Sequence, residues 1–224
     1  MKKWCARHAN IRYSILWSVL TLMVVFSVDV TQRVFAQSAT GSILIEDFSQ
    51  PDENGFPQKW DAQRSKVTAQ ETYVIGQEDG VSFLQSQNAS QRVYTKHMSW
   101  DPKTHPILTW RWRVRSVEEG AEFIAAVYPS LDTDLMFIPV NTKYVWSVSQ
   151  PVGTTKEGGM FGSTEVVIRS GAEQIGVWVE ERINVYEDFK EIHQHEPAPK
   201  AWGISLLGGP GVEVDFGSLA VHPE

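Results

Sequence analysis

The strongest constraint on the fold is a two-residue alternation in segment 108–115, which reads Leu-Thr-Trp-Arg-Trp-Arg-Val-Arg. Apolar residues occupy every second position, and Arg111, Arg113 and Arg115 lie between them. Successive side chains of a β-strand point to opposite faces of the sheet, so this strand has one apolar and one cationic face. We therefore predict a sheet that packs on one side and meets solvent on the other.

Similar short segments, rich in β-branched and aromatic residues, recur along the chain, and clusters of Gly, Pro, Asp and Asn separate them. This pattern predicts an all-β fold: a two-sheet antiparallel β-sandwich of the jelly-roll, galactose-binding-like or lectin-like kind. Segment 182–196 is expected to be an ordered loop with a helical turn over 186–192. The expected strands are 42–48, 72–76, 81–87, 92–97, 107–114, 123–128, 135–140, 143–147, 164–169, 175–180, 201–207 and 212–221.

The first 36 residues have the three parts of a secretory signal peptide: basic residues, an apolar run over 15–28, and small residues at Val34 and Ala36. The run is shorter than the roughly 20 residues that span a bilayer. We expect cleavage and export to the bacterial periplasm or medium, with no stable membrane insertion afterwards. An uncleaved anchor is the alternative, because Asp29 and Arg33 lengthen the cleavage region. Residues 37–224 are expected to form a single β-sandwich domain.

The charge balance excludes some classes of partner. The chain has 20 basic and 27 acidic residues; removal of residues 1–36 leaves 15 and 26, a net charge of −11. Such an acidic domain is not expected to bind nucleic acid or anionic lipid in general. Cys5 is the only cysteine and lies in the expected signal, so the exported domain has no internal disulfide.

The alternating strand has two interpretations on each face. Trp110 and Trp112 either fill the sandwich core or form a platform on which sugar rings stack. Arg111 and Arg113 either pair with carboxylates of a neighbouring strand or form a cationic strip for a carboxylated or phosphorylated ligand, since guanidinium groups bind such oxyanions in bidentate fashion.

The leading hypothesis is an exported, non-catalytic protein that binds a glycan or another anionic component of the cell envelope. Arg111 and Arg113 are expected to hold oxyanions, and either Arg182 or Asp188 to orient polar groups. The candidate stacking residues are Trp146, Tyr186 and Trp202.

A glycan hydrolase or lyase is the enzyme alternative, with two acting carboxylates drawn from Glu180, Glu181, Glu187 and Asp188. Glu180 and Glu181 cannot be that pair if they share a strand, because neighbours on a strand point to opposite faces. The chain contains no Gly-x-Ser-x-Gly motif, phosphate-binding loop or dinucleotide fingerprint, and no cofactor is expected. A structural accessory subunit of an envelope complex is a third hypothesis, which predicts an exposed apolar patch.

Metal binding is not expected. His193, His195 and Glu196 alternate like ligands on one strand face, but no third histidine matches them. A structural calcium ion is an alternative if the two ends of the domain meet, because calcium prefers six to eight oxygen ligands. The acidic and amide groups that would then converge are Glu46, Asp47, Asp52, Asn54, Glu213 and Asp215.

Several segments together resemble an uncharacterised bacterial envelope family, domain of unknown function 3047. The resemblance spans about residues 45–221 and implies a secreted β-sandwich of the jelly-roll kind, with no established activity to assign to particular residues. The segments that carry it are Phe-Pro-Gln-Lys-Trp at 56–60, Gly-Val-Ser-Phe-Leu at 80–84 with Ala-Ser at 89–90, Pro-Ile-Leu-Thr-Trp-Arg-Trp-Arg-Val at 106–114, Tyr-Val-Trp at 144–146, Val-Ile-Arg-Ser-Gly at 167–171 and Asn-Val-Tyr-Glu-Asp-Phe at 184–189.

Overall fold

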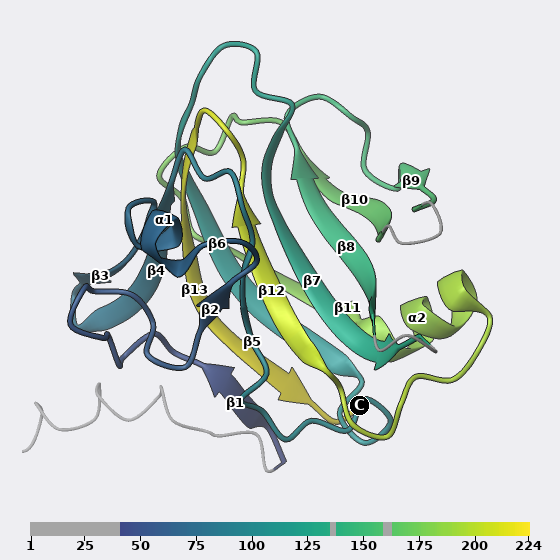
Figure 1. Ribbon diagram of the computed structural model, residues 1–224. Helices are drawn as coiled ribbons and strands as arrows, with labels where there is room; N and C mark the ends of the chain where they lie inside the picture. The colour runs from purple at the N-terminus through teal and green to yellow at the C-terminus, as the bar shows by residue number, and fades with distance from the viewer. Residues whose placement is uncertain (1–40, 135–137, 159–162) are drawn as a thin grey trace, which may run out of the picture. The chain divides into compact units, whose positions relative to one another are not determined.

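Strands dominate the structure, a computed structural model that describes residues 41–134, 138–158 and 163–224. The expected signal peptide lies outside these residues. Thr40–Glu224 form one compact unit (Figure 1). Its elements are β1 Ile43–Glu46, β2 Asp61–Ala62, α1 Lys66–Gln70, β3 Tyr73–Glu78, β4 Val81–Gln87, β5 Val93–Thr95, β6 Ile107–Val117, β7 Phe123–Thr133, β8 Pro139–Ser147, β9 Thr155–Lys156, β10 Thr164–Ser170, β11 Val179–Asn184, α2 Val185–His193, β12 Gly203–Gly208 and β13 Val212–His222.

The strands form two sheets that pack face to face, which confirms the all-β sandwich. The first sheet has the order β11-β6-β13-β4-β3, and β1 also pairs with β13. The second sheet has the order β2-β5-β12-β7-β8-β10-β9. One pair, β8 with β10, is parallel. This pair departs from the antiparallel arrangement that the sequence predicts. The chain makes this pair by returning through β9, which then pairs antiparallel with β10.

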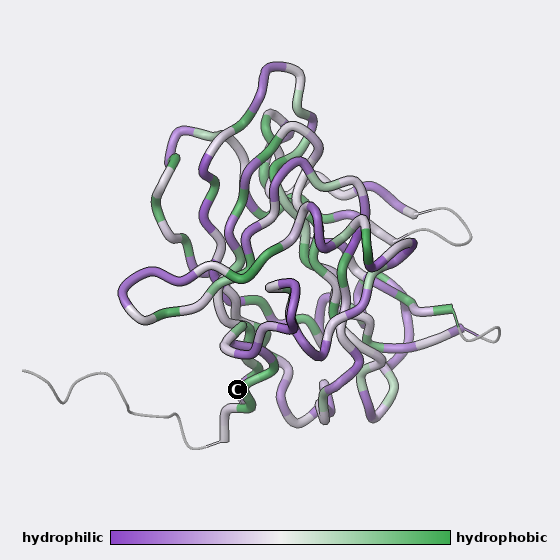
Figure 2. Tube along the Cα trace, turned by 60° about the vertical axis from the view of Figure 1, so that its left-hand side comes forward, coloured by the Kyte–Doolittle hydropathy of each residue, from purple (hydrophilic) through white to green (hydrophobic). Residues whose placement is uncertain are grey.

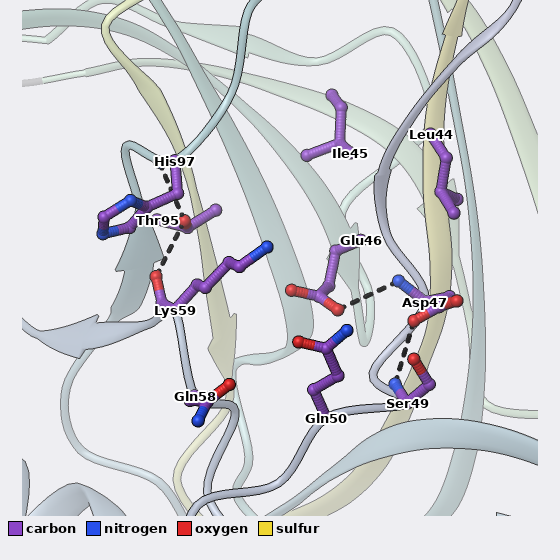
Figure 3. A pocket seen from close by; sticks show the side chains of 10 residues that line it. All are labelled: Leu44, Ile45, Glu46, Asp47, Ser49, Gln50, Gln58, Lys59, Thr95 and His97. Atoms are coloured by element: carbon purple, nitrogen blue, oxygen red, sulfur yellow. Dashed lines mark hydrogen bonds between the residues drawn. The ribbon is translucent and has the colours of Figure 1, made fainter.

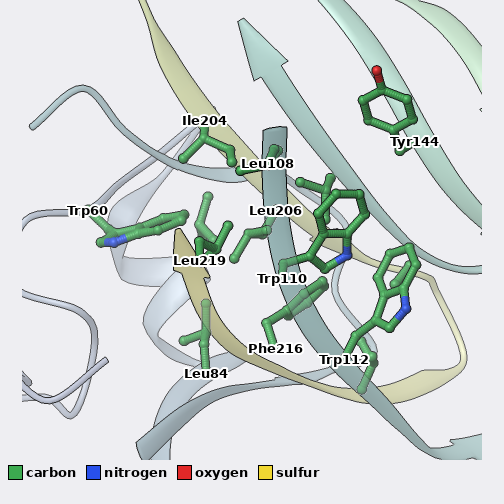
Figure 4. Close-up of a cluster of buried hydrophobic side chains, with 14 of the residues drawn as sticks. Trp60, Leu84, Leu108, Trp110, Trp112, Tyr144, Ile204, Leu206, Phe216 and Leu219 are labelled. Atoms are coloured by element: carbon green, nitrogen blue, oxygen red, sulfur yellow. The ribbon is translucent and has the colours of Figure 1, made fainter. Parts of the chain in front are cut away.

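The apolar face of β6 lies in the core between the two sheets. Leu108, Trp110, Trp112 and Val114 are each at most 1% exposed. The rings of Trp110 and Trp112 lie 5.5 Å apart at 88°, an edge-to-face arrangement that aromatic pairs favour (Figure 4). The structure therefore confirms that the two tryptophans fill the core.

Two expected elements need correction. The strand expected over 175–180 begins only at Val179, because the preceding segment turns at Gly176 with a φ of 78° and leaves Ile175 and Val177 more than half exposed. Where strands were expected over 135–140 and 143–147, the structure has the single strand β8; residues 135–137 lie outside the described part.

The helical turn expected over 186–192 is present as α2. Asn184 caps its first turn, and its side chain accepts a hydrogen bond from the Glu187 backbone N–H at 3.0 Å. In the described part of the chain, no helix is long and apolar enough to cross a bilayer. Short hydrophobic and hydrophilic stretches instead follow one another along the chain (Figure 2).

Candidate functional site

The outer face of the second sheet carries aromatic and cationic side chains together. In β5, Val93 and Thr95 are buried, so alternation places Arg92, Tyr94 and Lys96 on the opposite face, away from the core. Tyr94 pairs in register with Ser205 of β12, and Ser205 with Tyr128 of β7. We call this surface, with Trp202 directly before β12, the Tyr94–Trp202 face.

Aromatic rings and cations contact one another across this face. The rings of Tyr94 and Trp202 lie 6.1 Å apart at 32°. The Lys96 ammonium lies 3.9 Å from the centre of the Trp202 ring and 5.6 Å from that of Tyr94. The Arg92 guanidinium lies 4.8 Å from the centre of the Tyr128 ring. Attraction between a cation and the negative face of an aromatic ring stabilises these contacts.

A pocket of about 340 Å³ opens on the Tyr94–Trp202 face. Backbone and hydroxyl groups support its polar wall: the Ser130 hydroxyl donates to Asn141 Oδ1, and Asn141 Nδ2 donates to the Pro139 carbonyl at 2.9 Å. Trp202 and Lys96 also line a second pocket of about the same volume. The first pocket's lining includes Arg92, Tyr94, Lys96, Asn141, Trp202 and Ser205.

Gly203 allows Trp202 to lie beside β5. A Cβ atom at this glycine would meet the Thr95 carbonyl oxygen at 2.6 Å and the Lys96 side chain at 3.6 Å. Real Cβ atoms do not approach a backbone oxygen so closely, so only glycine fits between the two strands at this point. The close approach brings the Trp202 ring under the Lys96 ammonium.

The Tyr94 hydroxyl is kept in its protonated form. Burial raises its pKa, and the charge and hydrogen bonding of Asp61 raise it further. Asp61 lies on β2, directly opposite Tyr94 in register. At neutral pH the ring is therefore an uncharged surface with a polar rim.

Arg113 lies elsewhere, on the outer face of the first sheet, where carboxylates neutralise it. Its Nε and Nη2 donate to Asp215 Oδ2 at 2.9 and 2.7 Å, and its Nη1 donates to Glu78 at 2.6 Å. The ring of Trp178 covers the guanidinium at 4.6 Å. Because Arg113 is 8% exposed and its charge is paired with two carboxylates, the expectation for it is corrected to the cross-strand pairing interpretation.

The other two candidate arginines belong to the same side of the molecule. Arg111 is half-buried, with its guanidinium 5.4 Å from the centre of the Trp178 ring. Arg182 is exposed on β11 and pairs in register with Thr109. Neither of them lies on the Tyr94–Trp202 face.

Three further candidate residues already form hydrogen bonds within the protein: Trp146, Tyr186 and Asp188. Trp146 is 1% exposed and donates its indole N–H to the Gly171 carbonyl at 2.7 Å, so it offers no stacking surface and that expectation is corrected. Tyr186 is largely buried and donates to Glu196; this hydrogen bond raises the pKa of Tyr186 to about 12. Asp188 accepts a hydrogen bond from the Tyr144 hydroxyl at 2.9 Å. Of the candidate residues, the structure places only Trp202 on the Tyr94–Trp202 face.

The four carboxylates of the enzyme hypothesis have separate surroundings. Glu181 Oε1 accepts from the Trp112 indole at 3.0 Å and from Arg169 at 2.7 Å. Glu187 pairs with Lys190 at 3.3 Å on the exposed side of α2. Burial raises the pKa of Asp188, which contacts Tyr144, and Glu180 is exposed. Glu181 therefore has a structural use, and Glu187 and Asp188 have different partners from it and from each other.

The groups considered for calcium do not converge. The two ends of the domain do meet, with Ile43 opposite Val221, but Asp215 is committed to Arg113. Glu46 accepts from the backbone of Phe48 at 2.7 Å and from the Trp60 indole at 2.8 Å. Among the described residues, no group of three or more His, Cys, Asp or Glu side chains is arranged to hold a metal.

Glu46 instead lines a polar pocket of about 210 Å³ beside β1 (Figure 3). Figure 3 shows Glu46 and Lys59 reaching into it from either side. Its described lining contains no Phe, Tyr or Trp side chain, and the Asp47 carboxylate accepts from the Ser49 backbone at 2.9 Å. The Tyr94–Trp202 face therefore has the better chemistry for an organic ligand.

Comparisons with known proteins connect part of this face to a family. Residues 138–208 match the DUF3047 family model, "Protein of unknown function (DUF3047)". The match confirms the expected resemblance over this segment, which includes Asn141, Trp202 and Ser205. The segments expected to carry the resemblance before residue 138 lie outside it. No curated protein matches the chain.

Solved structures give distant likenesses. The carbohydrate-binding module TmCBM27, described for specific mannan recognition, has 12% identity and a TM-score of 0.39, covering 82% of this chain and 98% of that one. The family 11 carbohydrate-binding module of Clostridium thermocellum Lic26A-Cel5E has 7% identity and a TM-score of 0.44, covering 82% and 95%. A family 12 glycoside hydrolase has 12% identity and a TM-score of 0.44, covering 82% and 99%. Scores this low show no more than a general likeness, so the ligand of this chain has to be inferred from its own geometry.

Sequence reasoning missed most of the Tyr94–Trp202 face, although a signal was present. Arg92, Tyr94 and Lys96 alternate in the same way as the arginines of β6. The signal is weaker there, because the segment is shorter and only one aromatic residue lies between the two cations. Trp202 was a candidate, but its position beside Lys96 depends on the pairing of β5 with β12.

Proposed function

We propose that this protein is an exported, non-catalytic β-sandwich that binds a glycan on the Tyr94–Trp202 face. One observation carries the proposal: Tyr94 and Trp202 line a pocket together with amide, hydroxyl and cationic groups. Aromatic rings pack against the apolar C–H faces of sugars, while polar groups at the pocket wall select their hydroxyls. Two adjoining pockets of about 340 Å³ suit a chain of several sugar units better than one monosaccharide.

Export and a non-catalytic role are parts of this proposal. The signal-like pattern of the first 36 residues supports export. The different partners of Glu181, Glu187 and Asp188, which are Trp112, Lys190 and Tyr144, support binding without hydrolysis.

Affinity electrophoresis on gels that contain neutral and acidic polysaccharides tests the proposal. We expect the protein to be retarded by at least one polysaccharide, and Trp202→Ala to lose that retardation, because truncation removes the largest ring of the pocket. Trp178→Ala is the matched control: Trp178 is also a half-buried tryptophan, but it lies on the outer face of the first sheet. Retention of binding in Trp202→Ala, with loss in Trp178→Ala, would move the site to the first sheet and overturn the assignment.

A further inference from the structure

We infer that the ligand is an acidic glycan chain, whose carboxylates contact Arg92 and Lys96 at either end of Tyr94; this inference rests on the proposed function. The described lining of the first pocket contains these two cations and no Asp or Glu. The domain that presents it carries 26 acidic residues against 15 basic ones. Two cations and no carboxylate in the lining favour an anionic ligand even in an acidic domain; the Asp61 carboxylate, which contacts Tyr94 from β2, lies outside this lining.

Contacts with the Trp202 and Tyr94 rings position the Lys96 ammonium so that it can bind an anion. At 3.9 Å from the Trp202 ring centre, the ammonium has one side covered by the indole. An ammonium has three N–H donors, and those directed away from the ring are free to bind a carboxylate. In the described part of the chain, no Asp or Glu lies within ion-pair distance of Lys96 or Arg92. A ligand carboxylate would therefore supply a partner that the fold does not.

The spacing of the cations favours a chain with repeated charges over a single carboxylate. Arg92 and Lys96 are four residues apart on an extended strand, which separates their Cα atoms by about 13 Å. The Arg92 guanidinium lies over the Tyr128 ring and the Lys96 ammonium over the Trp202 ring, so the two charges are held at different aromatic residues. This arrangement suits the carboxylates of successive acidic sugar units better than one carboxylate. The second pocket adds a third cation, Lys200, and shares Lys96 and Trp202 with the first.

The one acid in the lining of the second pocket already has partners. Asp132 Oδ2 lies 3.7 Å from His195 Nδ1, and its Oδ1 accepts from the Thr133 backbone at 2.7 Å. The linings of the two pockets together contain three cations and this one carboxylate. The two pockets together present a cationic path that starts at Arg92 and ends at Lys200.

A polyuronate and its methyl ester provide the sharpest test, because esterification removes the charge and keeps the sugar chain. We would titrate the protein by calorimetry with polygalacturonate, alginate and hyaluronan and with the methyl ester of each. We expect about tenfold or more weaker binding to the ester of the preferred chain, and a similar loss for Arg92→Gln/Lys96→Gln on the acid form. Lys103→Gln/Lys156→Gln, which removes two charges elsewhere on the surface, should bind as the wild type does.

The other outcomes separate the inference from the proposed function. Equal binding of acid and ester, or binding of neutral polysaccharides alone, would overturn the acidic ligand and leave the glycan site intact. Binding of no polysaccharide would overturn both. Equal binding of dextran sulfate or single-stranded poly(dT) would show general affinity for polyanions and overturn recognition of a uronate. If Arg92→Gln/Lys96→Gln keeps full affinity for the unesterified polyuronate, neither Arg92 nor Lys96 belongs to the binding site.

Discussion

The two tryptophans of β6 differ in what their indole N–H groups contact. Trp112 Nε1 donates to Glu181 at 3.0 Å, whereas Trp110 Nε1 is buried without an acceptor in the described part of the chain. Both side chains are at most 1% exposed, so replacement by Phe removes a similar volume from the core. The hydrogen bond is therefore the main difference between the two sites.

We expect Trp112→Phe to lower the free energy of unfolding by about 1 to 3 kcal/mol more than Trp110→Phe, because it leaves a buried Glu181 oxygen with one donor fewer. Urea denaturation of the two variants, followed by circular dichroism, measures the difference. Equal losses would show that Trp110 Nε1 has a partner, such as a buried water molecule, that compensates for its burial.

At the scale of the element, the stability of α2 depends on the hydrogen bond between Asn184 and Glu187 at its N-terminus. The Asn184 side chain accepts from the Glu187 N–H, one of the backbone donors that a helix start leaves unpaired. We expect Asn184→Ala to destabilise the protein by about 1 kcal/mol, and Asn184→Ser to retain most of the stability, since serine also caps helices. Thermal unfolding compares the three proteins. A loss in Asn184→Ser as large as that in Asn184→Ala would point to the contact of Asn184 with Glu224 instead of the cap.

Elements whose pattern is local could be predicted from the sequence. The alternation in β6 and the helical turn at α2 are both present where they were expected. The strand expected over 175–180 was misplaced because Ile175 and Val177 are apolar residues in an exposed turn, which a local pattern cannot distinguish from a strand. Pairing is a tertiary property, so the parallel alignment of β8 with β10 could not be predicted either.

At the scale of the whole molecule, the candidate site is assembled by pairing between distant segments. Arg92 and Lys96 flank β5 on either side, while Trp202 directly precedes β12, more than a hundred residues later. Residue chemistry alone favoured Arg113, which has the same charge and a stronger pattern. Its neutralisation by Asp215 depends on the register of β6 with β13, which the sequence does not reveal.

The stability of the whole domain should also depend on pH, because the pKa values of two histidines change on folding. Burial lowers the pKa of His193 and His222, with contributions from His195 and Arg182 respectively. The folded state then binds fewer protons than the unfolded chain below the unfolded pKa of 6.5. Their contribution to stability is therefore complete above pH 6.5 and is lost as the pH falls through that value towards the folded pKa.

We expect His193→Gln/His222→Gln to lose less stability than the wild type between about pH 7.5 and pH 5.5, because neither glutamine takes up a proton on unfolding. Burial raises the pKa of Asp188 and Asp215, which has the opposite effect at lower pH, but both proteins keep these groups and the comparison cancels them. Urea titrations at the two pH values measure the change. His97→Gln, at an exposed histidine beside β5, should follow the wild type. If the double variant does so as well, burial of these two rings does not control the acid sensitivity of the sandwich.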